Sequence, residues 1–276
     1  MSERISEING YLDKLLAEYP LIPRSVIHGM ITAETSYNKN EYYRHEPDYW
    51  HAYMYQDRKF WAMAYKHVKG EEPVSELEIS KLFSASYGIM QTMYDIALDI
   101  DMRYNKEIGF NGAKYANVKA LMAKIVSGEA EISLLDTFVW AEEINEDDEL
   151  GLWFGLEEMR GKMNRTWTAL TEVFDDVDKQ PKSMTDFLLR GVLPKVCGKP
   201  VEVLDFFKFC VSSYQCGSGT IAKLMRITRG NWEKMSWENV KSHVLQIRNA
   251  RTTEMIKKHI DRAFKDVAAA DIAADL

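Results

Sequence analysis

The chain has 276 residues, of which 46 % are apolar and 28 % are charged, and its net charge is −7. This composition supplies enough apolar side chains for a real core and argues against disorder except at the ends. The acidic balance makes nucleic acid a poor partner, because phosphate backbones attract basic surfaces. Three cysteines, a small and odd number, fit reduced thiols made in a cytosol better than a disulfide framework.

The spacing of apolar residues predicts helices through most of the chain. The first is expected over residues 5–19, before Pro20 and Pro23, and Ser25 is expected to cap a second helix that ends at Glu34. A loop is expected over residues 38–49, and further helices over residues 50–67, 88–103, 134–144, 152–173, 201–213, 221–229 and 237–264. We find no internal repeat and no convincing strand alternation, so the predicted class is all-α.

We expect no signal peptide at the N-terminus and no membrane-spanning segment. Residues 1–7 are charged from the start and lack the apolar run of a signal peptide. No run of about eighteen apolar residues occurs, so no membrane span is expected. The Ala- and Asp-rich tail after Lys265 is expected to fray.

Four short segments carry the chemistry that we infer. Residues 33–38 read AETSYN, residues 43–47 read YRHEP, residues 86–91 read SYGIMQ and residues 214–219 read YQCGSG. In order and in type, the first and third resemble the Glu-Ser and Gly-Leu-Met-Gln motifs of the lytic transglycosylases and goose-type lysozymes. The second is similar to an Arg-Tyr-Glu-Pro segment of phage and proteobacterial members, and the fourth is a looser match to the family's Ala-Tyr-Asn-Ala-Gly.

This resemblance implies a lysozyme-like transglycosylase core that is split by a helical insertion. The long separation between the third and fourth segments is what suggests the insertion. The expected parts are an N-terminal helix, the first part of the core, the insertion, the second part of the core and a tail, over residues 1–21, 22–124, 125–185, 186–265 and 266–276.

The resemblance also implies a reaction, the cleavage of the β-1,4 bond between N-acetylmuramic acid and N-acetylglucosamine that leaves a 1,6-anhydro end. Glu34 would act as the acid and then as the base, and Tyr214 would orient its carboxyl. The acid has to hold its proton near neutral pH, and apolar surroundings favour this because they disfavour the ionised form. A simple lysozyme outcome would need a positioned water and a second acid such as Glu41, Glu46 or Asp48.

The same resemblance assigns residues to the sugar site. Gly88 would let the backbone approach a sugar, Met90 would form an apolar floor, and Gln91 would exchange hydrogen bonds with an N-acetyl group. Thr35 and Ser36 would bond near the carboxylate or cap the end of the helix. The full set of expected substrate-binding residues is Thr35, Ser36, Ser86, Gly88, Met90, Gln91 and Gln215. No metal and no organic cofactor is implied.

The implied partners are peptidoglycan glycan strands, with no nucleic acid and no membrane span. We expect synthesis in the bacterial cytoplasm without a signal peptide and action at the periplasmic wall. A phage particle is one vehicle that would carry the protein there, in company with other virion proteins.

Several other interpretations stay open at the level of the sequence. A structural or adaptor protein of a phage particle could retain the same fold without catalysis. Residues 217–222 spell a dinucleotide-binding pattern, which would need a preceding strand. His45, His51 and His67 could contribute to a zinc site, although no His-Glu-x-x-His is present. The aromatic stretch over residues 37–65 could line a sugar groove or belong to the core.

Overall fold

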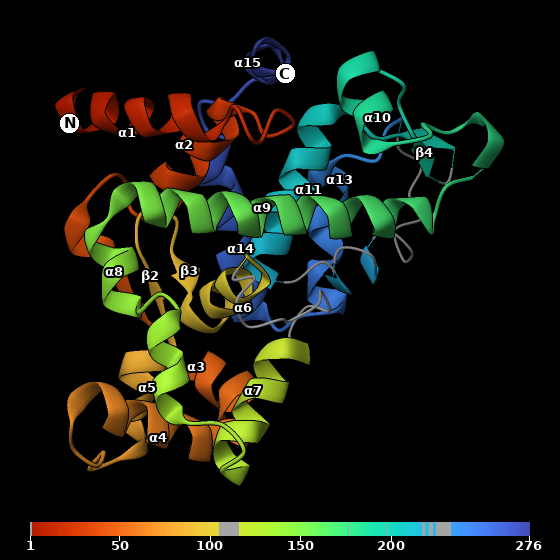
Figure 1. Cartoon of the computed structure of the whole chain (residues 1–276). Coiled ribbons are helices and arrows are strands. Elements are labelled where there is room, and N and C mark those ends of the chain that lie inside the picture. The colour runs from red at the N-terminus through yellow and green to blue at the C-terminus, as the bar shows by residue number, and fades with distance from the viewer. Residues whose placement is uncertain are drawn as a thin grey trace. The chain divides into compact units, whose positions relative to one another are not determined.

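The computed structural model describes residues 2–104, 116–175, 177–196, 198–216, 219–220, 223–224 and 233–276. Within them the chain is mostly helical with a few short strands, so the expected class is confirmed in its coarse form (Figure 1). The chain divides into two compact units, which we call the discontinuous unit (residues 1–36 and 156–276) and the continuous unit (residues 37–155).

The discontinuous unit consists mainly of helices. Its elements are α1 (Ser2–Leu15), α2 (Arg24–Glu34), η6 (Val177–Lys179), α10 (Met184–Arg190), α11 (Val203–Cys216), α13 (Trp237–Val240), η7 (Lys241–Gln246), α14 (Ala250–Ala263) and α15 (Ala269–Asp275), with the antiparallel strands β4 (Lys195–Val196) and β5 (Lys199–Pro200). The long helix α9 (Asp148–Thr171) begins in the continuous unit and ends in this one.

The start of α2 differs from the sequence prediction. The cap position is Pro23, not Ser25, and no side chain of the capping residue bonds there. Instead the carboxylate of Asp275 accepts a hydrogen bond of 2.7 Å from the backbone N–H of Ser25. A negative charge is favourable at this end because the free N–H groups of a first turn point outward.

The C-terminal tail is ordered where we expected it to fray. It contains α15, in which Ile272 is buried and which packs against α2. The expectation was wrong because a single buried isoleucine among alanines gives little periodic signal in a sequence.

A close helix–helix contact holds α2 in place. A Cβ added at Gly29 of α2 would lie 2.0 Å from the carbonyl oxygen of Ala263 on α14. Only a residue without a side chain permits the two backbones to approach in this way. The contact therefore sets the distance between α2 and α14, which matters because α2 carries Glu34 at its end.

The continuous unit contains short helices around a small sheet. Its elements are η1 (Lys39–Glu41), β1 (Tyr43–His45), α3 (Pro47–Tyr49), the π-helical turn η2 (Trp50–Met54), η3 (Tyr55–Asp57), α4 (Arg58–Lys69), α5 (Glu76–Phe83), β2 (Ala85–Tyr87), β3 (Thr92–Met93), α6 (Tyr94–Tyr104), α7 (Ala116–Ser127), η5 (Ile132–Thr137) and α8 (Ala141–Glu146). Both β1 and α3 lie within residues 38–49, where we expected a loop, and Pro47 occupies the first turn of α3.

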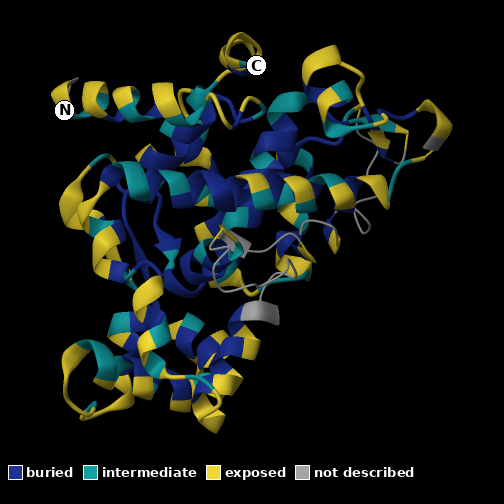
Figure 2. Cartoon of the chain, viewed as in Figure 1, coloured by how far each residue is buried: buried dark blue, intermediate teal, exposed yellow. Residues whose placement is uncertain are grey.

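The sheet of this unit was not foreseen. Its strands pair antiparallel in the order β1-β2-β3. They have three, three and two residues, which is too short for an alternation of apolar and polar residues to be visible. Figure 2 shows β2 in the dark blue of buried residues, whereas β3 has one buried residue, Thr92, and one half-buried residue, Met93. Long-range pairing, not local preference, creates these strands.

Aromatic side chains form the centre of the core of the continuous unit. The rings of Trp61 and Phe83 lie 4.9 Å apart, and Tyr94 stacks on Phe83 at 5.7 Å and on Trp140 at 6.2 Å. Part of the aromatic stretch over residues 37–65 therefore belongs to the core.

The two units do not follow the predicted parts of the chain. Their division falls after residues 36 and 155, whereas the predicted insertion covers residues 125–185. The insertion stays a prediction. None of the described helices is both long and apolar enough to cross a membrane.

Candidate functional site

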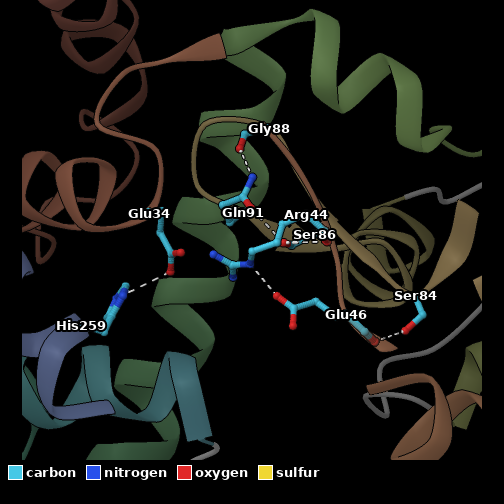
Figure 3. Close-up of polar contacts among 8 residues, drawn as sticks. All are labelled: Glu34, Arg44, Glu46, Ser84, Ser86, Gly88, Gln91 and His259. Carbon is cyan, nitrogen blue, oxygen red and sulfur yellow. Dashed lines mark hydrogen bonds and ion pairs between the residues drawn. The ribbon is translucent and has the colours of Figure 1, made fainter. Parts of the chain in front are cut away.

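Glu34 is the last residue of α2, and its side chain is almost fully withdrawn from solvent. The side chain is 2 % exposed, although the residue as a whole is half-buried because its backbone lies at the end of the helix. The Nε2 atom of His259 on α14 lies 3.6 Å from one carboxylate oxygen, as Figure 3 shows. Ile27, Met30 and Ile31, which precede Glu34 on α2, are all buried.

The packing of α2 on α14 places His259 beside Glu34. As α2 runs from Gly29 to Glu34, the facing contacts on α14 run back from Ala263 to His259, so the two helices are antiparallel. Ala263 and His259 are four residues apart and lie on one face of α14. The sequence offered no sign of this pairing, because the two partners are far apart in the chain.

Thr35 and Ser36 close the end of α2. The Thr35 hydroxyl donates to the carbonyl of Ile31 at 3.3 Å, and the Ser36 hydroxyl donates to the carbonyl of Thr32 at 3.0 Å. The Arg262 guanidinium also donates to the Thr32 carbonyl, at 3.1 Å. The sequence left two roles open for Thr35 and Ser36, bonding near the carboxylate or capping the end of the helix. These contacts fit the second role.

Tyr214 lies in the last turn of α11, a helix that packs against α14 as α2 does. The ammonium group of Lys162 lies 5.6 Å from the centre of the Tyr214 ring and donates to the carbonyl of Ser213 at 3.1 Å. The orientation of Glu34 by Tyr214 stays a prediction. The side chain of Gln215 and the segment Gly217–Ser218 lie outside the described residues.

In the continuous unit, strand pairing brings two of the sequence motifs together. Arg44 of β1 lies opposite Ser86 of β2. Beyond the strands, the Glu46 N–H donates to the carbonyl of Ser84, and the Ser84 hydroxyl donates to the carbonyl of Glu46, both at 2.8 Å. Arg44 and Glu46 form an ion pair at 2.6 Å (Figure 3). The YRHEP and SYGIMQ segments are therefore neighbours in space.

The Gln91 side chain bonds within its own turn. Its amide nitrogen donates to the Gly88 carbonyl at 3.0 Å, and its amide oxygen accepts from the Ser86 hydroxyl at 2.9 Å (Figure 3). Gln91 is 4 % exposed and has a left-handed backbone with φ of 53°. The internal bonds stabilise this uncommon conformation. Hydrogen bonding of Gln91 to a sugar stays a prediction.

Gly88 and Met90 are in close contact with the protein itself. A Cβ on Gly88, whose φ is 72°, would lie 2.8 Å from the Ile144 carbonyl oxygen. A Cβ on Gly155 of α9 would lie 2.4 Å from Met90, which is fully buried. Packing within the protein therefore accounts for a glycine at position 88 and a methionine at position 90, without any ligand. Their roles in a sugar site stay predictions.

The structure groups the predicted site residues in two sets. Glu34, Thr35, Ser36 and Tyr214 belong to the discontinuous unit, and the residues of the SYGIMQ turn belong to the continuous unit. His259 lies beside Glu34 of the first set, and the sequence analysis did not identify it.

The described residues also bear on the dinucleotide-binding and zinc sites that the sequence left open. Residues 203–216 form helix α11, so the strand that a dinucleotide fold would need before residue 217 is not there. His45 contacts the Ser80 hydroxyl and His67 contacts Asp136, each at 2.8 Å. No group of three or more potential metal ligands occurs among the residues that the structure describes. Burial raises the pKa of the Cys210 thiol, as expected for an inert cysteine.

Comparison of the chain with protein-family models, with curated proteins and with solved structures finds no match.

Proposed function

We propose that this chain is a peptidoglycan lytic transglycosylase that uses Glu34 as its single acid and base. The observation that carries the proposal is the burial of the Glu34 side chain, 2 % exposed, at the end of an apolar helix. General acids in glycoside cleavage are often carboxyls withdrawn from water, because low polarity disfavours the ionised form.

The reaction has two proton transfers. Glu34 donates a proton to the bridging oxygen as the bond between N-acetylmuramic acid and N-acetylglucosamine breaks. The resulting carboxylate then takes the proton of the substrate's own 6-hydroxyl group, whose oxygen closes the anhydro ring. His259, 3.6 Å away, lies beside the carboxyl during both steps.

The remaining assignments belong to the same proposal. Tyr214 orients the carboxyl, and Ser86, Gly88, Met90 and Gln91 shape the sugar site. The substrate is the glycan strand of the wall, and a phage particle is the proposed carrier.

The test is zymography on peptidoglycan with wild type, Glu34→Gln and Glu18→Gln. Glu34→Gln removes the transferable proton while keeping the shape, and we expect activity to fall by about 10²–10⁴-fold. Glu18, which is exposed in the same unit, is the matched control and is expected to change nothing. Mass spectrometry of the released fragments should show products one water lighter than hydrolysed ones. Clearing by Glu34→Gln at the wild-type rate would refute the assignment.

A second candidate function is a non-catalytic structural or adaptor protein of a phage particle. The observation that favours it is that Gln91 and Ser86 bond to their own turn and that Glu34 has an internal partner in His259. Under this alternative, neither wild type nor Glu34→Gln clears peptidoglycan, and Glu34→Gln has the lower thermal stability because it weakens the contact with His259.

A further inference from the structure

The continuous unit contains a pocket on the face of its sheet opposite to Arg44 and Ser86. Successive residues of a strand point to opposite faces. Tyr43 pairs with Tyr87 across β1 and β2, so these two side chains share one face while Arg44 and Ser86 share the other. The tyrosines line a pocket of about 410 Å³, a volume within the range of small-molecule sites, roughly 300–1,000 Å³.

The two tyrosine rings are held in fixed positions. The Tyr43 hydroxyl donates to the carbonyl of Lys81 at 2.9 Å, and the Tyr87 hydroxyl donates to the carbonyl of Leu82 at 2.5 Å. The ring centres lie 5.6 Å apart. Burial raises the pKa of both phenols, so both rings stay neutral. With each hydroxyl bonded to the backbone, the accessible surface that this pair offers to a ligand is the ring of Tyr43, which is 44 % exposed, and the 4 % exposed Tyr87 supports it from behind.

The polar side chains around these rings include one buried acceptor. The Asn145 amide oxygen is shielded from solvent, and the described part of the chain provides no hydrogen-bond donor to it. An acceptor left unpaired in this way costs free energy of about 1–3 kcal/mol, which is recovered when the Asn145 side chain turns its oxygen toward the N–H or O–H group of a ligand. Asn145 lines the pocket from α8.

The charges that line the pocket nearly cancel. Lys69 forms an ion pair with Glu142 at 3.0 Å. Lys81 and Glu146, one positive and one negative, lie on α5 and α8 and are both exposed. Glu78 of α5 adds one further negative charge, so the lining carries two lysines and three glutamates. A strongly charged ligand would gain little net attraction here, whereas a neutral ligand with both donors and acceptors could use each group.

We propose that this pocket is a non-catalytic carbohydrate site that binds a short neutral oligosaccharide. A sugar ring has an apolar C–H face that can pack on the exposed Tyr43 ring, which rests on Tyr87, and its hydroxyl or acetamido groups donate to the Asn145 oxygen. Lys81 and Glu146 supply a donor and an acceptor at the edge. The proposal goes beyond the proposed function, because binding here requires no bond cleavage and does not involve Glu34.

The test uses fluorine NMR of the full chain labelled with 3-fluorotyrosine, titrated with tri-N-acetylchitotriose. The protein carries Glu34→Gln so that the probe is not cleaved. The resonances of Tyr43 and Tyr87, assigned with Tyr→Phe variants, are expected to shift together and to saturate. Tyr53, which is 57 % exposed and lies outside the pocket, is the internal control and should not shift.

Two substitutions at Tyr43 separate the ring from its hydroxyl. Tyr43→Phe keeps the ring and should keep the affinity, whereas Tyr43→Ser should weaken it about tenfold, equivalent to about 1.4 kcal/mol. Asn145→Leu should also weaken binding, and it tests the proposal independently if Tyr43→Ser loses the fold.

The proposal is overturned if Tyr43 and Tyr87 do not respond, if Tyr53 responds equally, or if Asn145→Leu binds as the parent does. A response to the peptide Ala-Glu-Lys-Ala in place of the sugar would assign the pocket to peptides and would also overturn it. Since the measurement reads binding in a Glu34→Gln background, its failure is distinct from a failure of the zymogram.

Discussion

Asp101 of α6 is a half-buried carboxyl that gives the stability of the protein a pH dependence outside the proposed site. Burial raises its pKa above the ordinary value of 3.8, and the hydrogen bond of 2.7 Å from the Val139 N–H offsets only part of this. The negative charge of Glu143 raises the pKa further. The folded protein therefore binds this proton more tightly than the unfolded chain does.

The sign of the effect follows from that difference. The stability contributed by protonated Asp101 is fully present below pH 3.8 and is lost as the pH rises through the higher folded pKa. Asp101→Asn keeps an oxygen acceptor for Val139 and removes the charge, so we expect a higher free energy of unfolding at neutral pH and no gain below pH 3.8. Urea denaturation across this range is the measurement. Asp266→Asn, at an exposed position, is the control, and an equal gain there would contradict the argument.

At the scale of elements, the contact between α2 and α14 depends on one glycine. A side chain at Gly29 would meet the backbone of Ala263, which cannot rotate away as a flexible side chain could. Because α2 carries Glu34 and α14 carries His259, the same contact sets the distance between the two partners.

Two glycine substitutions in helices should have opposite effects. Gly29→Ala should lower the free energy of unfolding by about 1–3 kcal/mol, because the helices must move apart. Gly10→Ala in α1 should raise it by about 0.5–1 kcal/mol, since a Cβ there meets nothing within 4 Å and alanine is the better helix former. Chemical denaturation of the two variants checks this, and similar effects at both positions would show that the contact is not as tight as described.

At the scale of the whole molecule, the two units differ in how the chain supplies them. The continuous unit is one uninterrupted segment with its own aromatic core. The discontinuous unit takes α1 and α2 from one end of the sequence and packs α2 on α14 and α15 from the other. Folding of a unit made of distant segments costs more loop-closure entropy, and this entropy is lost before the stabilising contacts form.

This difference predicts the behaviour of fragments. A fragment of residues 37–155 should unfold in a single cooperative transition, because its core is complete within the segment. A fragment of residues 156–276 should fold only when residues 1–36 are added, because α2 would otherwise be missing from α14. Circular dichroism during thermal unfolding gives the readout. Cooperative folding of the second fragment alone would show that the division into units has a different energetic basis.

How much of the fold could be read from the sequence depends on the range of the interactions involved. The helical class and the approximate helices from residues 24–34 and 152–173 follow from local spacing, because an amphipathic helix repeats its pattern within a few turns. The strands, the cap from Asp275 and the ordered α15 each need a partner far along the chain, so no local pattern predicts them.

The candidate site divides in the same way. By itself, the sequence determined which residues could do chemistry, namely a glutamate that ends an apolar helix and a turn rich in small and amide side chains. Tertiary structure alone decided that the Glu34 side chain is withdrawn from water beside His259 and that Gln91 bonds to Ser86 and Gly88. The physical reason is that burial and pairing depend on which distant segments pack together, and such contacts carry no periodic signal in the chain.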